Sequence, residues 1–224
     1  VSHDIRTPLT SIIGYLGLIE ERRYQNEEEL LKYTHTAYTK AKQMKVLVED
    51  LFEYTKVRQT TTPLNLSKFD MVQLLEQLVA DFELEAEKRN MVIEVVTSYE
   101  SVQMEADTEK LVRVFNNLIS NALKYGKDGK KVFIEVQKTG KEAIISVNND
   151  GQPIPQKSLD QLFDRFYRVE ESRSQETGGT GLGLAIAQSI VALHGGYIYA
   201  SSDRNLTRFV MHLPLKQLAE KNND

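Results

Sequence analysis

Two asparagines one helical turn apart, Asn117 and Asn121, form the clearest chemical pattern in the chain, within NNLISNALKY (116–125). At 100° per residue they share a helix face with Lys124 and Tyr125. Each asparagine costs roughly several tenths of a kcal/mol in a helix relative to alanine. Their carbonyl oxygens suit Mg2+, a hard cation that retains water, and Lys124 adds a charge that attracts phosphate. The alternative is an ordinary polar helix surface.

A glycine-rich stretch, GGTGLGLA (178–185), opens another expected helix. Gly181 and Gly183 have no Cβ where backbone N–H groups would approach an anion, and the helix N-terminus favours negative charge. The stretch is neither a P-loop nor a dinucleotide fingerprint, and glycine clusters also serve as caps or packing points. The polar segment before it (168–179) is typical of a mobile lid.

A proline interrupts the helical pattern at the start of the chain, in SHDIRTPLT (2–10). Pro8 removes the hydrogen bond to the Asp4 carbonyl and costs about 3 kcal/mol or more. A helix that tolerates this cost should use the resulting kink. The residues at the kink are His3, Asp4 and Thr7.

Residues 1–60 predict two helices joined near residues 24–26. In the second helix, apolar residues recur every seven positions, as in a bundle seam: Leu30, Ala37, Met44 and Leu51. A hairpin of this size cannot bury its apolar stripes alone. We therefore expect a second copy to complete a dimeric four-helix bundle. The alternative is that the stripes pack on the rest of the same chain.

Residues 68–216 predict a separate α/β domain after a linker at 61–67, and a polar tail follows at 217–224. Helical periodicity covers 70–89, 107–125 and 181–196, and strand patterns cover 91–97, 131–138, 142–148, 197–202 and 207–214. Asp107 is the expected N-cap of the middle helix. Long helices that alternate with antiparallel strand pairs imply a two-layer α/β sandwich.

Composition is that of an ordinary globular protein, with 41% hydrophobic and 27% charged residues among 224. The net charge of -4 gives no electrostatic reason to expect nucleic-acid binding. The absence of cysteine excludes disulfides and thiol catalysis. No apolar run is long enough to span a membrane, and the chain begins with Val1 inside a helix pattern. We expect a fragment of a longer protein.

Five motifs in order resemble the H, N, G1, F and G2 boxes of bacterial sensor histidine kinases. They are SHDIRTPLT, NNLISNALKY, NNDGQPIP, LFDRFYR and GGTGLGLA. The resemblance covers nearly the whole chain. It implies a dimerisation and histidine-phosphotransfer hairpin, followed by an ATP-binding domain of the kind shared with gyrase, Hsp90 and MutL.

The resemblance also implies roles for individual residues. His3 would be the phospho-acceptor, Asp4 its neighbouring acid or base, and Asn121 the ligand of Mg2+. Thr7 would position a water for dephosphorylation of the partner, unless it only helps to tolerate Pro8. The other residues expected at the Mg-ATP site are Asn117, Lys124, Tyr125, Asn149, Asp150, Gly151, Arg168, Gly181, Leu182 and Gly183.

The G1 box departs from the family pattern of Asp-x-Gly-x-Gly, in which the Asp receives the adenine amino group. Here Asn149 takes the Asp position and Pro153 that of the second glycine, as in vancomycin-sensor-like kinases, which also lack this Asp. A neutral hydrogen bond in place of a charge-assisted one would cost roughly 1 kcal/mol. Asp150 takes the role instead if the loop is shifted by one residue.

Two rival functions remain on the sequence alone. An ATP-hydrolysing machine of the same nucleotide fold would have a glutamate to activate water where this chain has Asn117. A non-enzymatic dimeric scaffold is supported only by Asn149 and Pro153. The kinase reading implies autophosphorylation, a receiver-domain partner, and a cytoplasmic position in a membrane-bound parent sensor. Phosphorylation within or between protomers stays undecided.

Overall fold

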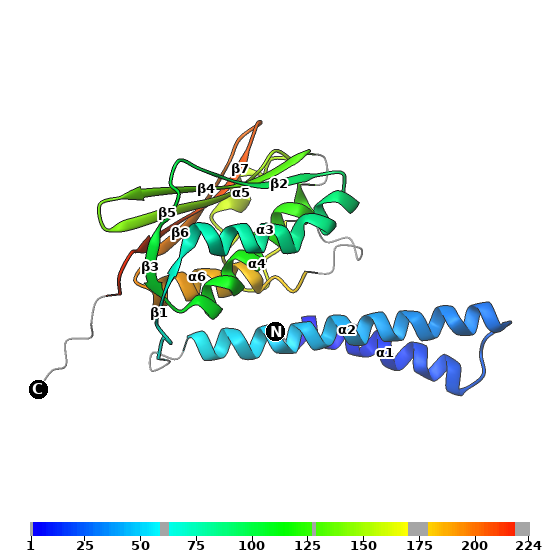
Figure 1. The fold of residues 1–224 in the computed structure, drawn as a ribbon. Helices are drawn as coiled ribbons and strands as arrows, with labels where there is room; N and C mark the ends of the chain where they lie inside the picture. The colour runs from blue at the N-terminus through cyan, green and yellow to red at the C-terminus, as the bar shows by residue number, and fades with distance from the viewer. Residues whose placement is uncertain (1, 59–62, 127–128, 170–178, 218–224) are drawn as a thin grey trace, which may run out of the picture.

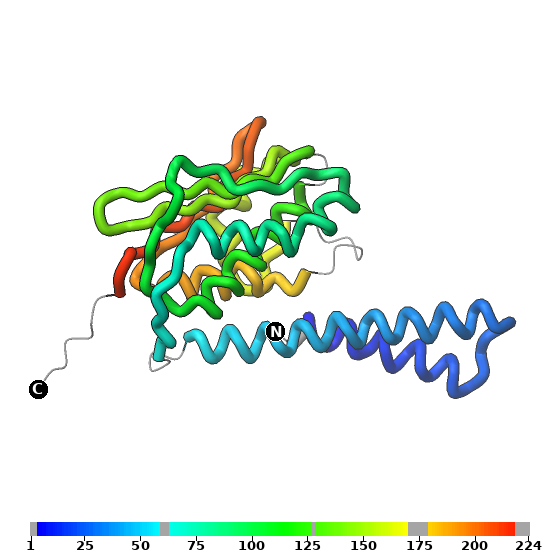
Figure 2. The backbone as a smooth tube through the Cα atoms, in the orientation of Figure 1, coloured from blue at the N-terminus to red at the C-terminus, as the bar shows by residue number. Residues whose placement is uncertain are grey.

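The computed structural model describes residues 2–58, 63–126, 129–169 and 179–217, with side chains from Asp4 onward (Figures 1 and 2). Its first part is an antiparallel hairpin of α1 (Ser2–Glu20) and α2 (Glu27–Val57). Asn26 is the N-cap of α2, because its side chain accepts a hydrogen bond from the Glu29 N–H. α1 continues through Pro8 as one helix.

The second part is built on a five-stranded sheet with the order β2-β4-β5-β7-β6. The strands are β2 (Val92–Thr97), β4 (Lys131–Thr139), β5 (Glu142–Asn149), β6 (Tyr197–Ser202) and β7 (Thr207–Pro214). All neighbours are antiparallel except β2 and β4. The expected antiparallel pairs of β4 with β5 and of β6 with β7 are both found. The partner of β2 was not predicted, and its pairing with β4 is parallel because a helical crossover separates the two strands.

Three helices cover one face of this sheet and lie between it and the hairpin (Figure 1). They are α3 (Met71–Lys88), α4 (Thr108–Tyr125) and α6 (Gly183–Leu193); a fourth, α5 (Gln156–Leu159), is a single turn. Asp107 caps α4 by accepting from the Lys110 N–H. The apolar face of α4 is buried, as the sequence predicts: Leu111, Val114, Phe115, Leu118, Ile119, Ala122 and Leu123. The two-layer α/β sandwich is confirmed.

A second, two-stranded sheet was not expected from the sequence. β1 (Ser67–Asp70) pairs antiparallel with β3 (Gln103–Ala106). Ser67, expected in the linker, pairs with Ala106. Four residues are too few for an alternating pattern to stand out, so these strands depend on tertiary contacts.

The hairpin packs against the sandwich through the second half of α2. Leu47, Tyr54 and Val57 are buried in the same apolar cluster as the sandwich core. Of the predicted stripe residues, Leu51 is partly buried against this cluster, so the alternative of packing within one chain holds for that residue. By contrast, the α1 side chains of Ile13 and Leu16 are 62% and 51% exposed.

Candidate functional site

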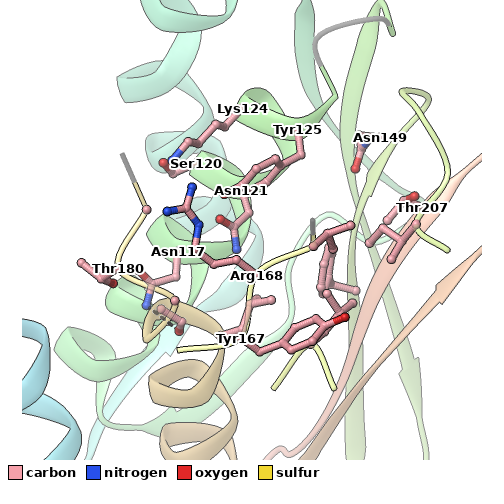
Figure 3. Close-up of a pocket in the computed structure, with 18 of the residues that line it drawn as sticks. Asn117, Ser120, Asn121, Lys124, Tyr125, Asn149, Tyr167, Arg168, Thr180 and Thr207 are labelled. Atoms are coloured by element: carbon pink, nitrogen blue, oxygen red, sulfur yellow. Dashed lines mark hydrogen bonds between the residues drawn. The ribbon is translucent and has the colours of Figure 1, made fainter. Parts of the chain in front are cut away.

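A cavity of about 380 Å³ lies where α2, α4, the loop after β5 and the start of α6 meet. One face of α4 forms its longest wall, as the sequence predicts (Figure 3). The α4 residues lining it are Asn117, Ser120, Asn121, Lys124 and Tyr125. The predicted polar face therefore borders a cavity rather than open solvent.

The two asparagines of this face are held differently. Asn117 Nδ2 donates a hydrogen bond to the Gly183 carbonyl at 3.1 Å, which ties α4 to the first residue of α6. A Cβ at Gly183 would lie 3.3 Å from Asn117 Oδ1, so a side chain there would crowd this contact. Asn121 has no hydrogen-bond partner within the described ranges. Its amide is available to a ligand.

The glycine-rich segment packs closely against the preceding loop. Gly181 has φ +72°, and a Cβ there would lie 2.8 Å from the Phe166 Cα. Its carbonyl accepts a hydrogen bond from the Phe166 N–H at 2.9 Å. Glycine is required here both for the positive φ and for the close approach of two backbones.

Leu182 does not line the cavity, although its neighbours Gly181 and Gly183 do. Its side chain is fully buried in the apolar core. Leu182 occupies the N-cap position of α6. The side chain therefore anchors the start of α6 in the core, because an apolar side chain gains free energy from burial, and the expected contact of Leu182 with ATP stays a prediction.

Lys124 and Arg168 bring positive charge to the same cavity (Figure 3). Burial, together with the smaller effects of the Arg168 and Arg89 charges, lowers the pKa of Lys124 to about 8. A Cβ on Gly179 would lie 3.2 Å from Lys124 Nζ. The lysine therefore faces the glycine-rich segment, in a place where an anion would relieve the repulsion between cations.

The loop after β5 decides between the two expected contacts with the base. Asn149 lines the cavity and is 4% exposed. Asp150 does not line it. Its Oδ1 accepts from the Lys130 and Lys131 N–H groups, both at 2.8 Å, which fixes the turn before β4. Of the two residues, Asn149 is therefore the one that borders the cavity, and contact with a base stays a prediction.

Gly151 also lies outside the cavity lining. A Cβ on Gly151 would lie 2.5 Å from the Gly126 Cα, so the two backbones touch. This glycine lets the end of α4 pack against the loop after β5. It shapes the site from behind rather than by contact with a ligand.

An acidic residue of the hairpin, Asp50, also lines the cavity and was not expected from the sequence. It is 7% exposed, and its two oxygens bind groups from the other domain. The Thr180 hydroxyl donates to Oδ2 at 2.7 Å, and the Arg113 guanidinium donates to Oδ1. Asp50 thus joins α2 to α4 and to the glycine-rich segment. Its position among the heptad residues of α2 gave no signal of this role.

The wall opposite α4 contains β-strand residues that were also missed. Thr207 and Phe209 of β7 line it, with Ile154 from the loop after β5. The hydroxyls of Thr207 and Ser202 are 2.6 Å apart, and the Ile154 N–H donates to the Ser202 hydroxyl at 2.9 Å. Only the pairing of β6 with β7 and the return of the loop bring these residues together.

The H-box residues lie apart from this cavity. His3, Asp4 and Thr7 belong to α1, and of these Asp4 and Thr7 do not line the cavity. The side chain of His3 is outside the described part of the structure. The side chains of Asp4 and Thr7 are exposed.

Clusters of at least three His, Cys, Asp or Glu side chains suited to a metal are absent from the described ranges. A divalent cation at this site would take most of its ligands from a bound phosphate and water, which is the habit of Mg2+. The described helices also include none with the length and apolarity needed to cross a membrane.

Comparison with protein families gives two matches in succession. Residues 1–60 match the His Kinase A (phospho-acceptor) domain. Residues 106–217 match the histidine kinase-, DNA gyrase B- and HSP90-like ATPase family. The second match contains all of the cavity residues on α4, β7 and the glycine-rich segment.

Individual relatives agree with both matches. The sensor protein VanS of Enterococcus faecium is 39% identical over 216 residues, 96% of this chain and 55% of VanS. The chain thus spans about half the length of this relative. Acinetobacter baumannii histidine kinase AdeS has a TM-score of 0.76 and 25% identity, over 95% of this chain and 98% of that one.

Histidine kinase ThkA, solved in complex with the response regulator TrrA, has a TM-score of 0.78 and 26% identity, over 99% of this chain and 61% of that one. The chain therefore belongs to the histidine kinase-, DNA gyrase B- and HSP90-like ATPase family, as the catalytic core of a bacterial two-component sensor histidine kinase.

Proposed function

We propose that this chain transfers the γ-phosphoryl group of ATP to His3 and then to an aspartate of a response regulator. The observation that carries the proposal is one cavity that combines the free amide of Asn121, the cations of Lys124 and Arg168, and the start of α6. These groups suit a triphosphate, and they occur in a chain that also matches a phospho-acceptor domain.

In this proposal the triphosphate lies between α4 and the glycine-rich segment. Lys124 and Arg168 offset its charge, and N–H groups at the start of α6 donate to its oxygens. The base lies against β7, with Asn149 at its polar edge. Asn121 would hold Mg2+ together with the phosphates. That ion would neutralise charge on the transferred group and fix its orientation.

His3 acts as the nucleophile. A neutral ring nitrogen donates its lone pair to the γ-phosphorus, the bond to the bridging oxygen breaks, and ADP leaves. Asp4 accepts or orients the proton on the other ring nitrogen. Because none of the described side chains of α1 lines the cavity, the ATP-binding part would rearrange its contacts with α2 to reach His3.

We also propose that two chains pair through the hairpins, with the exposed apolar residues of α1 at the interface. Ile13 and Leu16 are the clearest of these. The receiver domain of a response regulator would bind near the exposed N-terminal turns of α1. ThkA is solved with such a regulator. The parent protein would be a membrane-bound sensor with this core on the cytoplasmic side, where ATP and regulator are present.

Hydrolysis of ATP as the main activity is less well supported. The amide of Asn117 cannot act as a general base, and its Nδ2 is bonded to the Gly183 carbonyl. A scaffold without activity would not need the unpartnered amide of Asn121 beside two cations.

The proposal is tested by incubating the chain with γ-labelled ATP and Mg2+. We expect label that is lost in acid and stable in alkali, the behaviour of phosphohistidine. Label released only as free phosphate would favour the hydrolytic alternative, and absence of both would favour the scaffold.

Lys124 should report phosphate binding by taking up a proton. Its pKa is lowered to about 8, so it is partly neutral at pH 8 and fully charged at pH 6.5. Bound phosphate stabilises the charged form and raises this pKa. ADP binding should therefore take up about half a proton at pH 8 and almost none at pH 6.5. Calorimetry in two buffers of different ionisation enthalpy measures this uptake.

The matched variants are Lys124→Met and Lys88→Met. Lys88 is exposed at the end of α3 and does not line the cavity. Uptake at pH 8 should disappear in Lys124→Met and persist in Lys88→Met. Equal uptake in both variants would assign the proton to another group.

Thr7 supports a second activity, dephosphorylation of the regulator. It lies one turn from His3 on α1, and its side chain is exposed. We propose that its hydroxyl positions the water that attacks the aspartyl phosphate of a docked receiver domain. Thr7→Ala should keep phosphorylation of His3 and lose most of the phosphatase activity, measured as decay of labelled regulator.

Thr10→Ala serves as the control, since Thr10 is also exposed on α1. It should retain both activities. Loss of both activities in Thr7→Ala, or of neither, would make Thr7 a structural residue that helps α1 to continue past Pro8.

A further inference from the structure

The base-binding end of the cavity has an unusual polar group, the amide of Asn149. This side chain is 4% exposed, lines the cavity and has no hydrogen-bond partner within the described ranges. A largely buried amide without a partner in the protein has lost part of its hydration at some cost, while its polar atoms still border the cavity. The cost is recovered when a ligand supplies hydrogen bonds. Asn149 is therefore a contact for whatever lies in this end of the cavity.

Nothing in the surrounding wall fixes which end of the amide faces the ligand. A Cβ on Gly126 would lie 3.1 Å from Asn149 Nδ2, and Gly126 has no side chain to occupy that space. The nearby hydroxyls of Thr207 and Ser202 bond each other, and either one can be the donor. Each of these polar groups can present a donor or an acceptor, so the wall is adaptable.

No carboxylate faces this end of the cavity among the described residues. Asp150 accepts two backbone N–H groups and does not line the cavity. Asp50 does line it, but it is bonded to Thr180 and Arg113. Thr180 lies on the opposite side of the cavity from Asn149 (Figure 3). Among the described residues, a base at this end therefore meets no free carboxylate side chain.

An amide and a carboxylate at this end of the cavity would interact differently with the 6-position of a purine. Adenine presents an N6 donor beside the N1 acceptor, whereas a 6-oxo purine presents an O6 acceptor beside the N1–H donor. A carboxylate pairs only with the first pattern and repels O6. An amide pairs with the first pattern in one orientation and with the second after a half-turn about its last torsion.

We infer that Asn149 makes the site permissive at the purine 6-position, so that 6-oxo nucleotides such as those of hypoxanthine and guanine bind with affinity close to that of adenine nucleotides. This inference rests on the proposed nucleotide function and adds the base specificity of the same site. Asn149 is a specificity residue, and the chemistry of phosphoryl transfer is unchanged by which base is bound.

The test compares ADP with IDP, which differ at the 6-position and lack the complication of the guanine 2-amino group. Calorimetry or competition binding should give affinities within about fivefold of each other in the natural chain. In Asn149→Asp the ADP affinity should stay the same or rise several-fold, while IDP binding falls, so that the ratio increases about tenfold or more. Asn116→Asp adds the same charge to α4 outside the cavity lining and should leave the ratio unchanged.

The outcomes separate this inference from the proposed function. Binding of ADP with rejection of IDP as strong in the natural chain as in Asn149→Asp would overturn the inference and leave the kinase proposal intact. Failure of ADP itself to bind would overturn both. The labelling of His3 can then be compared with ITP and with ATP as the phosphoryl donor. Similar labelling with both would extend the result from binding to turnover.

Discussion

His3→Gln should abolish ATP-dependent labelling of the protein while leaving nucleotide affinity unchanged. Glutamine keeps the size and polarity of histidine but has no ring nitrogen with a nucleophilic lone pair. Because His3 lies on α1 and the described lining residues begin on α2, its replacement should leave every group expected to hold the nucleotide in place. The two measurements, incorporated label and ADP affinity, should therefore separate completely.

The matched control is His35→Gln. His35 is exposed on α2, so this variant makes the same chemical change on the same hairpin without touching an expected reactive group. It should be labelled like the natural chain. Label that persists in His3→Gln would move the phospho-acceptor elsewhere and remove the basis of the kinase proposal.

Mixing two variants tests whether phosphorylation runs within one protomer or between the two protomers of a dimer. If two chains pair, His3→Gln retains an intact nucleotide site, and Asn121→Leu retains an intact acceptor. A mixed dimer should be labelled on the Asn121→Leu chain only when phosphorylation runs between protomers. Labelling that requires both sites on one chain would show that it runs within a protomer.

Much of the fold was predictable because its signals are local. The apolar face of α4 and the cap at Asp107 both follow from spacing along one element. The parallel pairing of β2 with β4 and the small sheet of β1 with β3 did not follow. Both depend on where distant segments meet, and four-residue strands carry too little pattern to reveal it.

The residues of the candidate site also fall into those that local sequence patterns reveal and those that only the structure reveals. The α4 face and the glycine-rich segment were predictable from local sequence. Helical spacing shows which residues share a face, and a run of glycines indicates where the backbone can approach a ligand or another segment closely. Asp50 was not, because its partners Thr180 and Arg113 come from other elements. The choice between Asn149 and Asp150 also needed the structure, since only the bonds from Lys130 and Lys131 show that Asp150 is engaged elsewhere.

The contrast between the two asparagines of α4 leads to the second large effect. Asn117 is part of the fold, because it donates to Gly183 and joins two helices. Asn121 has no hydrogen-bond partner in the described part of the chain and borders the cavity. Replacing Asn121 should therefore cost little stability. Asn121→Leu should unfold at nearly the natural temperature, as should Asn116→Leu, the same change on the same helix outside the cavity lining.

Activity should behave quite differently. If the Asn121 oxygen holds Mg2+ on the phosphates, its loss removes charge stabilisation that a metal supplies in the transition state, and the rate of labelling should fall about 10²-fold or more. Asn121→Asp should fail as well, because a carboxylate beside the phosphates adds repulsion and alters the charge of the metal site. Asn116→Leu should keep its activity. Titration with Mg2+ tests whether the loss of activity is due to the metal. If Asn121 is a metal ligand, the Mg2+ requirement of labelling should be lost or shifted in the variants. Near-natural labelling and Mg2+ dependence in both Asn121 variants would make this face an ordinary polar surface.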